Sequence, residues 1–387
     1  MKIALVTSEF PPMNQAAAAR IGPWADALSD RGHEVLILTS KEAGGTGDSR
    51  IKASRRGVPS NQSGLLSRFW QEFLLGRELV ASLKRLPNDL DCVVITSPPF
   101  FMASMCCRAA FEMGVPFVFD VRDRYPDVLF QLGVLRPGGI IGRCLSYFER
   151  KIYQKARLVT TVTKSLQGHL SELTDADKVL HIPNGFDESL FSTDLLNTPK
   201  REKFTVVYHG RFSRLHDVEA LRRTTLEVQL RKAEVRFLII GPIPNSIREK
   251  DWGNTEFHGE TPRKDIPGLL APCHLGISLM KTNRATTVAF PAKVFEYLGA
   301  GLPVLASPEG EMTQILQSQD VGIVFSQPEP VAMTEALINL ANDHPTYDRL
   351  SANVRAIRLE MDRRMSATRF VESLENLFLK KGARGSN

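Results

Sequence analysis

The sequence predicts an α/β fold with two doubly wound parallel-sheet domains. Short apolar runs alternate with longer amphipathic runs along the whole chain, a pattern typical of strands joined by helical crossovers. The short runs are apolar at almost every position, as strands are when helices cover both faces of a parallel sheet. A polar stretch at residues 188–203 separates two such series, so we expect one sheet on each side of it.

The first half of the chain opens with a strand–helix–strand unit. Residues 20–31 carry Ile21, Trp24 and Leu28 at helical spacing and stop at Gly32, which predicts a helix between two strands. The candidate strands of this half are residues 2–7, 34–39, 92–97, 116–121, 158–163 and 179–182.

The second half repeats this order of strands and helices. Its candidate strands are residues 204–209, 237–240, 275–279, 303–306 and 322–325, with a short one near Phe257. The chain is therefore divided into an N-terminal domain at 1–185, a linker at 186–203, a C-terminal domain at 204–365 and a C-terminal helix at 366–387. A return of that helix to the N-terminal domain is left open. Ligands of such sheets bind beyond the carboxyl ends of the strands, so candidate site residues are sought in those loops.

Composition indicates a soluble protein. Of the 387 residues, 43% are hydrophobic and 24% charged, which is ordinary for globular proteins. The formal charge of +6 permits an anionic partner, but the basic residues form no aromatic-interleaved cluster of the kind that binds nucleic acid. The N-terminal apolar run at residues 3–7 is too short for a signal peptide core, and no apolar run is long enough to span a membrane, so we expect a cytoplasmic location. Five cysteines without C-x-x-C spacing indicate free structural thiols.

Residues 290–304 form the most informative segment. They predict a loop, a helix begun by Pro291, a Gly-Ala-Gly stop and a buried strand. The free N–H groups of a first helical turn, together with the helix dipole, favour an anionic phosphate. Lys293 adds a positive charge, and Glu296 lies about one turn further in, where a carboxylate can accept hydrogen bonds from ribose hydroxyls. The segment therefore indicates a nucleotide-sugar site, with an ordinary capped helix as the alternative.

Three further loops follow predicted strands. Small residues at 16–19 allow the backbone to approach a ligand. The loop at 120–127 contains three carboxylates and two arginines; a carboxylate there could position or deprotonate an acceptor hydroxyl, or the charges could simply neutralise one another. In the loop at 208–216, Gly210 allows close approach, and Arg211 and Arg214 could clamp a diphosphate.

No metal site is expected. The eight histidines show neither H-x-x-x-H nor H-x-H spacing. The Asp89-Leu90-Asp91 triplet precedes a predicted strand instead of following one, so it should lie at the edge of the sheet opposite to the ligand-binding loops.

Two segments have the composition of membrane-surface helices. Residues 65–84 place aromatic and aliphatic side chains among sparse charges, after a basic run at 50–56. Residues 140–157 mix such side chains with basic ones, as helices lying on an anionic membrane do. Packing of both segments against a sheet is the alternative.

Together these segments resemble the GT-B glycosyltransferases, above all the retaining family 4 enzymes that build bacterial surface polysaccharides. The likeness covers nearly the whole chain and is carried by Glu9-Phe10-Pro11-Pro12, Arg31-Gly32-His33-Glu34-Val35, Ile182-Pro183-Asn184-Gly185-Phe186-Asp187 and residues 293–304. The Arg122-Asp123 pair with Tyr125-Pro126 behind it resembles the branch of N-acetylfucosamine-type transferases of O-antigen and capsule synthesis.

The resemblance implies two Rossmann-like domains facing a cleft, with acceptor on the N-terminal domain and a nucleotide sugar, UDP-linked, on the C-terminal one. It implies transfer with retention to a glycan or polyprenyl-linked acceptor, with no cofactor or obligatory metal, at the inner face of the cytoplasmic membrane. The residues implied for donor binding are Ala16, Ala17, Gly210, Arg211, Arg214, Pro291, Ala292, Lys293, Val294 and Glu296. Those implied for catalysis are Arg122, Asp123 and Glu296.

The chain also departs from the family pattern. Family 4 commonly has a second glutamate eight residues before Glu296, where this chain has Val288; the change fits a donor sugar with one hydroxyl missing or altered. The basic residue usually paired with the Gly-Arg arginine falls at His216, so Arg214 is taken as its substitute. Two alternatives stay open: a catalytically degenerate GT-B binding or scaffold protein, and an enzyme like the UDP-sugar 2-epimerases.

Overall fold

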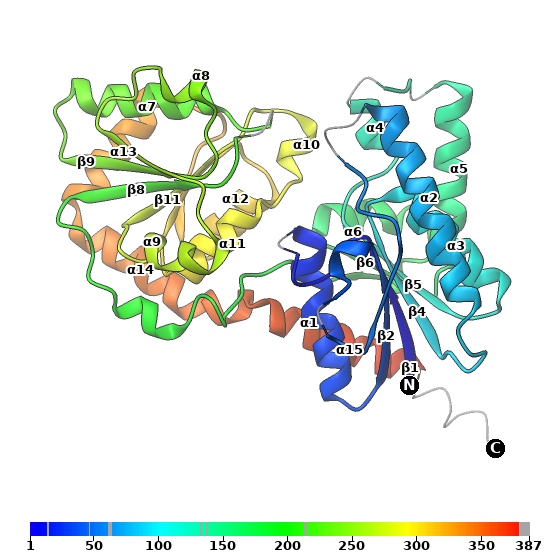
Figure 1. Ribbon diagram of the computed structural model, residues 1–387. Coiled ribbons are helices and arrows are strands. Elements are labelled where there is room, and N and C mark those ends of the chain that lie inside the picture. Colours follow the sequence, from blue (N-terminus) through cyan, green and yellow to red (C-terminus); the bar gives the residue numbers. More distant parts are fainter. Residues whose placement is uncertain are drawn as a thin grey trace. The chain divides into compact units, whose positions relative to one another are not determined.

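The computed structural model describes residues 1–378 except 14, 46, 61–63, 132–133, 137 and 213–214. The chain forms two compact units (Figure 1). The first consists of Met1–Pro183 with Ser366–Asn387, and the second of Asn184–Met365. Each contains a parallel sheet with helices on both faces, so the predicted fold class is confirmed.

The sheet of the first unit has the strand order β3-β2-β1-β4-β5-β6-β7. The chain adds strands first on one side of β1 and then on the other, so the switch point lies between β1 and β4, where ligands of such sheets bind. The strands are β1 (Lys2–Val6), β2 (Glu34–Thr39), β3 (Ile51–Ala53), β4 (Cys92–Ser97), β5 (Phe117–Val121), β6 (Leu158–Thr161) and β7 (Val179–His181).

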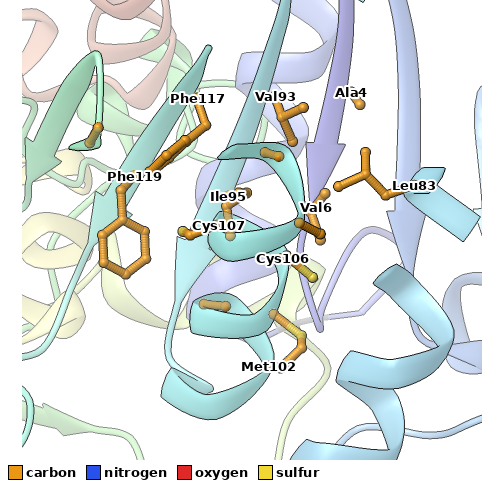
Figure 2. Packing of buried hydrophobic residues seen from close by; sticks show 14 of the residues in the cluster. Ala4, Val6, Leu83, Val93, Ile95, Met102, Cys106, Cys107, Phe117 and Phe119 are labelled. Carbon is orange, nitrogen blue, oxygen red and sulfur yellow. The ribbon is translucent and has the colours of Figure 1, made fainter. Parts of the chain in front are cut away.

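Helices cover both faces of this first sheet. On one face lie α2 (Leu65–Lys84), α3 (Phe100–Glu112), α5 (Ile140–Lys155) and α6 (Lys164–Ser171). Figure 2 shows Met102, Cys106 and Cys107 of α3 among the apolar side chains of the neighbouring strands. The other face is covered by α1 (Ala16–Asp30) and α15 (Arg363–Phe378). Trp24 of α1 stacks on Phe370 of α15 with ring centroids 3.8 Å apart, so the C-terminal helix belongs to the core of the first unit.

The sheet of the second unit has the order β10-β9-β8-β11-β12-β13, with its switch point between β8 and β11. One face is covered mainly by α7 (Val218–Leu230) and α13 (Pro330–Asn342), and the other by α9 (Ile266–Leu270), α11 (Ala292–Gly299) and α12 (Glu311–Ser318). The strands are β8 (Phe204–His209), β9 (Val235–Ile240), β10 (Thr255–Gly259), β11 (Leu275–Leu279), β12 (Val304–Ser307) and β13 (Gly322–Val324). The remaining helices are α4 (Asp127–Gln131) of the first unit and α8 (Asn245–Arg248), α10 (Arg284–Thr287) and α14 (His344–Ile357) of the second.

Two local features differ from the sequence-based expectations. Strand β3 was not predicted because it has only three residues, two of them exposed, and so shows no apolar run. Helix α11 begins at Ala292, and Pro291 precedes it as the N-cap residue with an extended ψ of 133°, instead of occupying the first turn.

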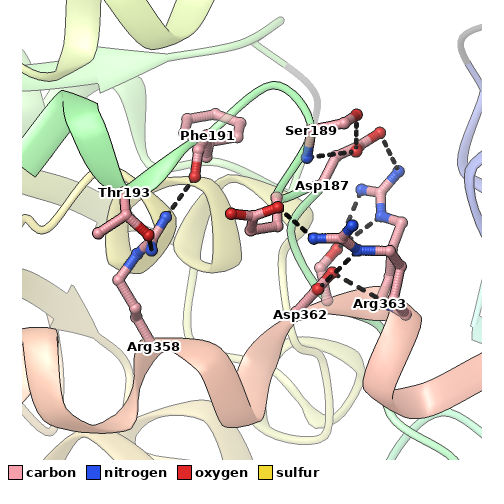
Figure 3. Close-up of polar contacts among 10 residues, drawn as sticks. Asp187, Ser189, Phe191, Thr193, Arg358, Asp362 and Arg363 are labelled. Atoms are coloured by element: carbon pink, nitrogen blue, oxygen red, sulfur yellow. Dashed lines mark hydrogen bonds and ion pairs between the residues drawn. The ribbon is translucent and has the colours of Figure 1, made fainter. Parts of the chain in front are cut away.

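The segment expected as a polar linker is fixed onto the second unit. Phe186 and Phe191 are buried in its core. The Phe186 N–H donates to the Met361 carbonyl, and the Arg363 N–H donates to the Phe186 carbonyl. Figure 3 shows the buried guanidinium of Arg358 donating to the Phe191 carbonyl and to Thr193. The chain therefore enters this unit along a path set by backbone pairing and a buried arginine.

Candidate functional site

Two glycines shape the carboxyl edge of the second sheet. Gly210 and Gly241 have φ values of +114° and +141°, a region that glycine adopts without strain. Their backbones touch, since a Cβ on Gly241 would lie 2.5 Å from the Gly210 carbonyl oxygen. The Gly210 N–H donates to Ile240 and the Gly241 N–H to Gly259, so the loops after β8, β9 and β10 meet directly.

The loop after β8 is also attached to β11. His216 pairs with Met280 in an isolated antiparallel bridge. The Asp217 N–H donates to the Leu279 carbonyl, and the Lys281 N–H donates to the Leu215 carbonyl. These bonds place the His216 imidazole at the switch point between β8 and β11.

Tyr297 fixes helix α11 to the same edge. Its hydroxyl oxygen accepts a hydrogen bond from the His209 N–H at 2.8 Å and donates to the Ile277 carbonyl at 3.3 Å. The side chain is fully buried, so its position is set by packing as well. Lys293 and Glu296, three residues apart on this helix, consequently share the face that meets the β8 loop.

Glu296 lies beside basic side chains. Its Oε2 is 3.1 Å from His209 Nδ1 and its Oε1 is 3.8 Å from Arg263 Nη2. Burial by itself raises the pKa of Glu296, but His209, Arg263 and Arg363 outweigh it, so the pKa is lowered. The carboxylate is therefore ionised at neutral pH and suited to accept hydrogen bonds from hydroxyl groups.

Lys293 is buried beside this carboxylate, with 8% of its surface exposed. Its Nζ lies 3.2 Å from His216 Nε2 and 3.8 Å from the centre of the Tyr208 ring. It also borders Gly210, since a Cβ there would lie 3.7 Å from Nζ. Burial lowers the pKa of Lys293 to about 7, and the charge of Glu296 opposes this only in part.

The other predicted donor-binding residues of this unit surround the start of α11. Ala292 is exposed, Val294 is buried and Pro291 is half-buried without a side-chain cap. The N–H groups of a first helical turn have no intrahelical acceptor, which leaves those of Ala292 and Lys293 directed out of the helix end. Arg211 follows Gly210 and is exposed, whereas Arg214 lies outside the described residues. The structure thus brings Gly210, Lys293 and Glu296 together.

The charges at residues 120–127, at the end of β5 and in the loop after it, divide into buried and exposed members. Asp120 is fully buried and binds the Arg20 guanidinium, with Nη2 to Oδ1 at 2.9 Å. The hydroxyls of Thr96 and Thr160 donate to the same carboxylate at 2.9 and 2.7 Å. Asp120 therefore has a structural role, as a buried partner of other side chains in the core of the first unit.

The remaining charges of this loop differ in their surroundings. Arg122 is half-buried and donates from Nη2 to the Pro98 carbonyl at 3.0 Å. Arg124 and Asp127 form an ion pair at 2.6 Å. Asp123 is exposed, which leaves it as the carboxylate of the loop that an acceptor could reach.

The loop before α1 contains a carboxylate, that of Glu9, that was not predicted as a site residue. Ala16 is exposed and Ala17 is buried, and the Ala17 N–H donates to the carboxylate of Glu9. Burial raises the pKa of Glu9, while Arg122 opposes the shift. The amide of Ala17, predicted to bind donor, thus has an acceptor within the chain.

His209, Tyr297 and Arg263 were not predicted as site residues. His209 ends a predicted strand, and Arg263 follows β10. Both therefore lie at or just after the carboxyl end of a strand, where site residues were sought. Their contacts with α11 depend on the sheet order β10-β9-β8-β11, which the sequence does not show. None of the helices in the described part of the chain has the length and apolar character needed to span a bilayer.

Each half of the chain matches a model of a known glycosyltransferase family. Residues 22–190 match the model of Glycosyltransferase Family 4, and residues 203–343 match that of Glycosyl transferases group 1. A probable glycosyltransferase of Pseudomonas aeruginosa, WbjE, is 22% identical over 296 residues, which span 72% of this chain and 73% of that protein. TuaH of Bacillus subtilis strain 168, described as a putative teichuronic acid biosynthesis glycosyltransferase, is 25% identical over 224 residues, which span 52% of this chain and 55% of that protein.

Solved structures share the fold of the whole chain. Anabaena Alr3699/HepE, crystallised with UDP-glucose, superposes with a TM-score of 0.68 at 17% identity, over 97% of this chain and 100% of that one. Sucrose-phosphate synthase of Thermosynechococcus elongatus superposes with a TM-score of 0.70 at 15% identity, over 98% and 99%. With both halves matched by glycosyltransferase models and both sheets arranged as in these enzymes, the chain belongs to the GT-B glycosyltransferases.

Proposed function

We propose that this glycosyltransferase moves a hexosyl or N-acetylhexosaminyl group from a UDP-linked donor to a lipid-linked glycan during synthesis of a bacterial surface polysaccharide such as O-antigen, lipopolysaccharide or capsule. The observation that carries the proposal is the grouping of Glu296, Lys293 and Gly210 at the switch point of the second sheet. An ionised carboxylate and a lysine beside a helix start match the ribose and the diphosphate of one ligand.

Each group has a separate part in donor binding. Glu296 accepts hydrogen bonds from the ribose hydroxyls. The diphosphate lies at the N–H groups of Ala292 and Lys293, close to Gly210, with the ammonium of Lys293 and the guanidinium of Arg211 as counter-charges.

The transfer step needs no obligatory metal in this proposal. The bond between the anomeric carbon and the diphosphate oxygen breaks, and a bond to the acceptor oxygen forms on the same face of the sugar. The acceptor proton goes to the departing diphosphate, whose charge Arg211 and Lys293 stabilise. Asp123, with Arg122 beside it, orients the acceptor hydroxyl.

The named relatives support the choice of donor and pathway. HepE was crystallised with UDP and with UDP-glucose, and TuaH is named for teichuronic acid synthesis. Val288, 44% exposed, offers no hydrogen bond where family 4 enzymes commonly carry a glutamate. A donor sugar that lacks or alters one hydroxyl fits this difference.

We further propose that α5 and the N-terminal part of α2 contact an anionic membrane. Both helices flank α3 on the same face of the first sheet (Figure 1). Large apolar side chains on them are exposed, namely Leu66, Trp70, Phe73, Ile140, Ile141, Tyr147 and Phe148. The exposed charged residues of α5 are all basic: Arg143, Arg150, Lys151 and Lys155.

The acidic residue of α5 does not weaken this positive surface. Glu149 is buried, and the Tyr153 hydroxyl donates to it at 2.5 Å. Burial raises the pKa of Glu149 to about 8, so the carboxyl is mostly uncharged at neutral pH. Exposed apolar side chains next to uncompensated basic ones match the interface of an anionic bilayer.

Thermal unfolding with UDP, GDP, ADP and CMP tests donor binding. A nucleotide that binds the native state raises stability by mass action, by about 2.7 kcal/mol at a concentration of 100 times Kd. We expect UDP to raise the melting temperature of the wild-type chain and to have little effect on Glu296→Gln. Glu219→Gln, which alters an exposed glutamate of α7 in the same unit, should respond like the wild type.

Several results would contradict the proposal in distinguishable ways. No response to any nucleotide would favour a degenerate GT-B binding protein. A response to UDP without sugar transfer, but with epimerisation of a UDP-sugar, would favour the 2-epimerase alternative. An inverted anomeric configuration in the product, read from its proton coupling constant, would exclude retention.

A further inference from the structure

Lys293 and His216 form a pair of basic groups inside the second unit. Their nitrogens, Nζ and Nε2, lie 3.2 Å apart, and a hydrogen bond at that distance needs one proton donor and one lone pair. If both were protonated, neither would offer a lone pair and the charges would repel. The pair therefore holds at most one positive charge while the site is empty.

The surroundings of Lys293 do not fix that charge. From β8, the ring of Tyr208 lies 3.8 Å from Nζ, and from α11 the carboxylate of Glu296 acts at longer range. Among the described residues, the ion pairs of Glu296 are with His209 and Arg263, not with Lys293. Within the described part of the chain, Lys293 thus has no carboxylate in direct contact, although it is almost fully buried.

Burial consequently favours the neutral forms. It lowers the pKa of Lys293 to about 7 and, together with the charge of that lysine, lowers the pKa of His216 to about 4. Near pH 8, Lys293 is mostly an uncharged amine and His216 an uncharged imidazole. A diphosphate arriving at the start of α11 would meet a site that lacks one of its positive charges.

We propose that binding of a nucleoside diphosphate at this site is coupled to the uptake of one proton by Lys293. The inference rests on the proposed function, because it takes a diphosphate as the ligand. The anion stabilises the ammonium form, so the –NH₂ group takes a proton from solvent and becomes –NH₃⁺, while no covalent bond of the ligand changes. His216 is a positioning residue, because its lone pair accepts a hydrogen bond from the new ammonium. The other two N–H groups of that ammonium then remain available to the diphosphate.

The coupling determines how affinity depends on pH. A ligand that prefers the protonated lysine binds more weakly as pH rises through the pKa of the empty site. With that pKa near 7, affinity falls by up to about 50-fold between pH 7 and pH 9. A phosphate with a second pKa of about 6, the value typical of phosphate monoesters, is about nine-tenths ionised at pH 7. Its remaining ionisation adds negative charge to UDP as pH rises, so the ligand itself cannot account for weaker binding.

Titration calorimetry of the full chain with UDP tests the coupling. The experiment is run near pH 8 in two buffers with different ionisation enthalpies, because the dependence of the measured heat on the buffer gives the number of protons taken up. We expect close to one proton for the wild type. Lys293→Arg, which keeps the charge but cannot lose its proton, should bind UDP with no uptake and with an affinity independent of pH.

Lys200 provides a matched control in the same unit. Its Nζ donates to the Ala271 and Cys273 carbonyls at 2.8 and 2.7 Å, away from α11. Burial lowers the pKa of Lys200 to about 8, so it is also a buried lysine that titrates near neutral pH. Lys200→Arg should leave the proton uptake on UDP binding unchanged.

Each result gives a decision. Binding of UDP to the wild type without proton uptake overturns the coupling and leaves the proposed function in place. Uptake that persists in Lys293→Arg assigns the proton to another group and also overturns it. Absence of UDP binding at every pH removes the proposed function and the coupling together. If the arginine variant does not fold, the wild-type proton number and its pH dependence still decide.

Discussion

Asp120 and Arg20 form a buried ion pair whose energetics are set by what surrounds each charge. Asp120 is fully buried and Arg20 nearly so, and Arg20 also lies over the Trp24 ring at 4.5 Å. Two threonine hydroxyls also donate hydrogen bonds to the Asp120 carboxylate. Neither charge can reach water, so each depends on the other.

Arg20→Met should destabilise the first unit strongly. It leaves Asp120 buried with two neutral donors, and loss of one partner of a buried ion pair costs about 3–5 kcal/mol. Denaturant unfolding measures the loss. The double variant Arg20→Met/Asp120→Asn should lose less than the sum of the single changes.

An exposed pair in the same unit provides the comparison. Arg31 binds Glu375 at 2.7 Å with 42% of its side chain exposed, so Arg31→Met should lose only a small fraction of the stability lost in Arg20→Met. Equal losses in the two variants would show that burial does not control the energetics of the Arg20–Asp120 pair.

At the level of elements, backbone contact between loops shapes the nucleotide site. Gly241 follows β9, and its backbone lies against that of Gly210 after β8. A side chain on Gly241 would push its loop away from the loop after β8, which carries His216. The geometry of the site thus depends on residues that contribute no functional group.

Gly241→Ala should weaken both stability and UDP binding. The φ of +141° is unfavourable for alanine, and the new Cβ would lie 2.5 Å from the Gly210 carbonyl oxygen, so we expect a loss of more than about 1 kcal/mol. Thermal unfolding with and without UDP measures both effects.

Gly268 is the matched control for this substitution. It lies in α9 of the same unit, and a Cβ there would meet no atom within 4 Å. Gly268→Ala should leave UDP binding unchanged and stability the same or slightly higher. A Gly241→Ala variant that binds UDP as well as Gly268→Ala would show that contact between the two loops is not required.

The elements also show where sequence patterns succeed. Strands β1, β4, β8 and β11 were predicted because a strand that is buried on both faces is apolar at nearly every position. Strand β3 was not predicted because a short edge strand with two exposed residues buries little apolar surface and therefore shows no apolar run. The start of α11 was displaced by one residue, because proline suits both the cap and the first turn and only the backbone angles distinguish them.

For the whole molecule, the positive charge and the exposed apolar side chains are not evenly spread. The chain carries a formal charge of +6, and α5 presents basic and apolar groups together. Charge distributions of this kind bear on solubility and on binding to charged partners more than on the fold.

Arg150→Gln/Lys151→Gln should reduce binding to anionic vesicles. Each basic residue near an anionic surface contributes about 1 kcal/mol, so the double change should weaken binding roughly 30-fold. Flotation with phosphatidylglycerol vesicles measures it, and added salt should weaken wild-type binding by screening.

The controls are a neutral membrane and a remote substitution. Phosphatidylcholine vesicles should bind the wild type much less. Leu230→Ser removes an exposed apolar side chain, 76% exposed, from α7 of the second unit and should not affect flotation. Equal binding to both vesicle types, or none to either, would contradict the membrane proposal.

The sequence by itself determined the fold class, the division into two series of strands and the segment that contains Lys293 and Glu296. These features follow from local pattern, since periodicity, glycine and proline act over a few residues. The contacts of Glu296 with His209 and of Lys293 with His216 were decided only by the tertiary structure. Glu296 and His209 are 87 residues apart in the chain, and Lys293 and His216 are 77 residues apart.

Tertiary structure also decided which charges are buried. Four of the five residues at 120–124 are charged in the sequence, yet Asp120 is fully buried and Asp123 is exposed. The reason is that a residue's dielectric surroundings and partners depend on which strands become neighbours, and sheet order is a property of the whole chain.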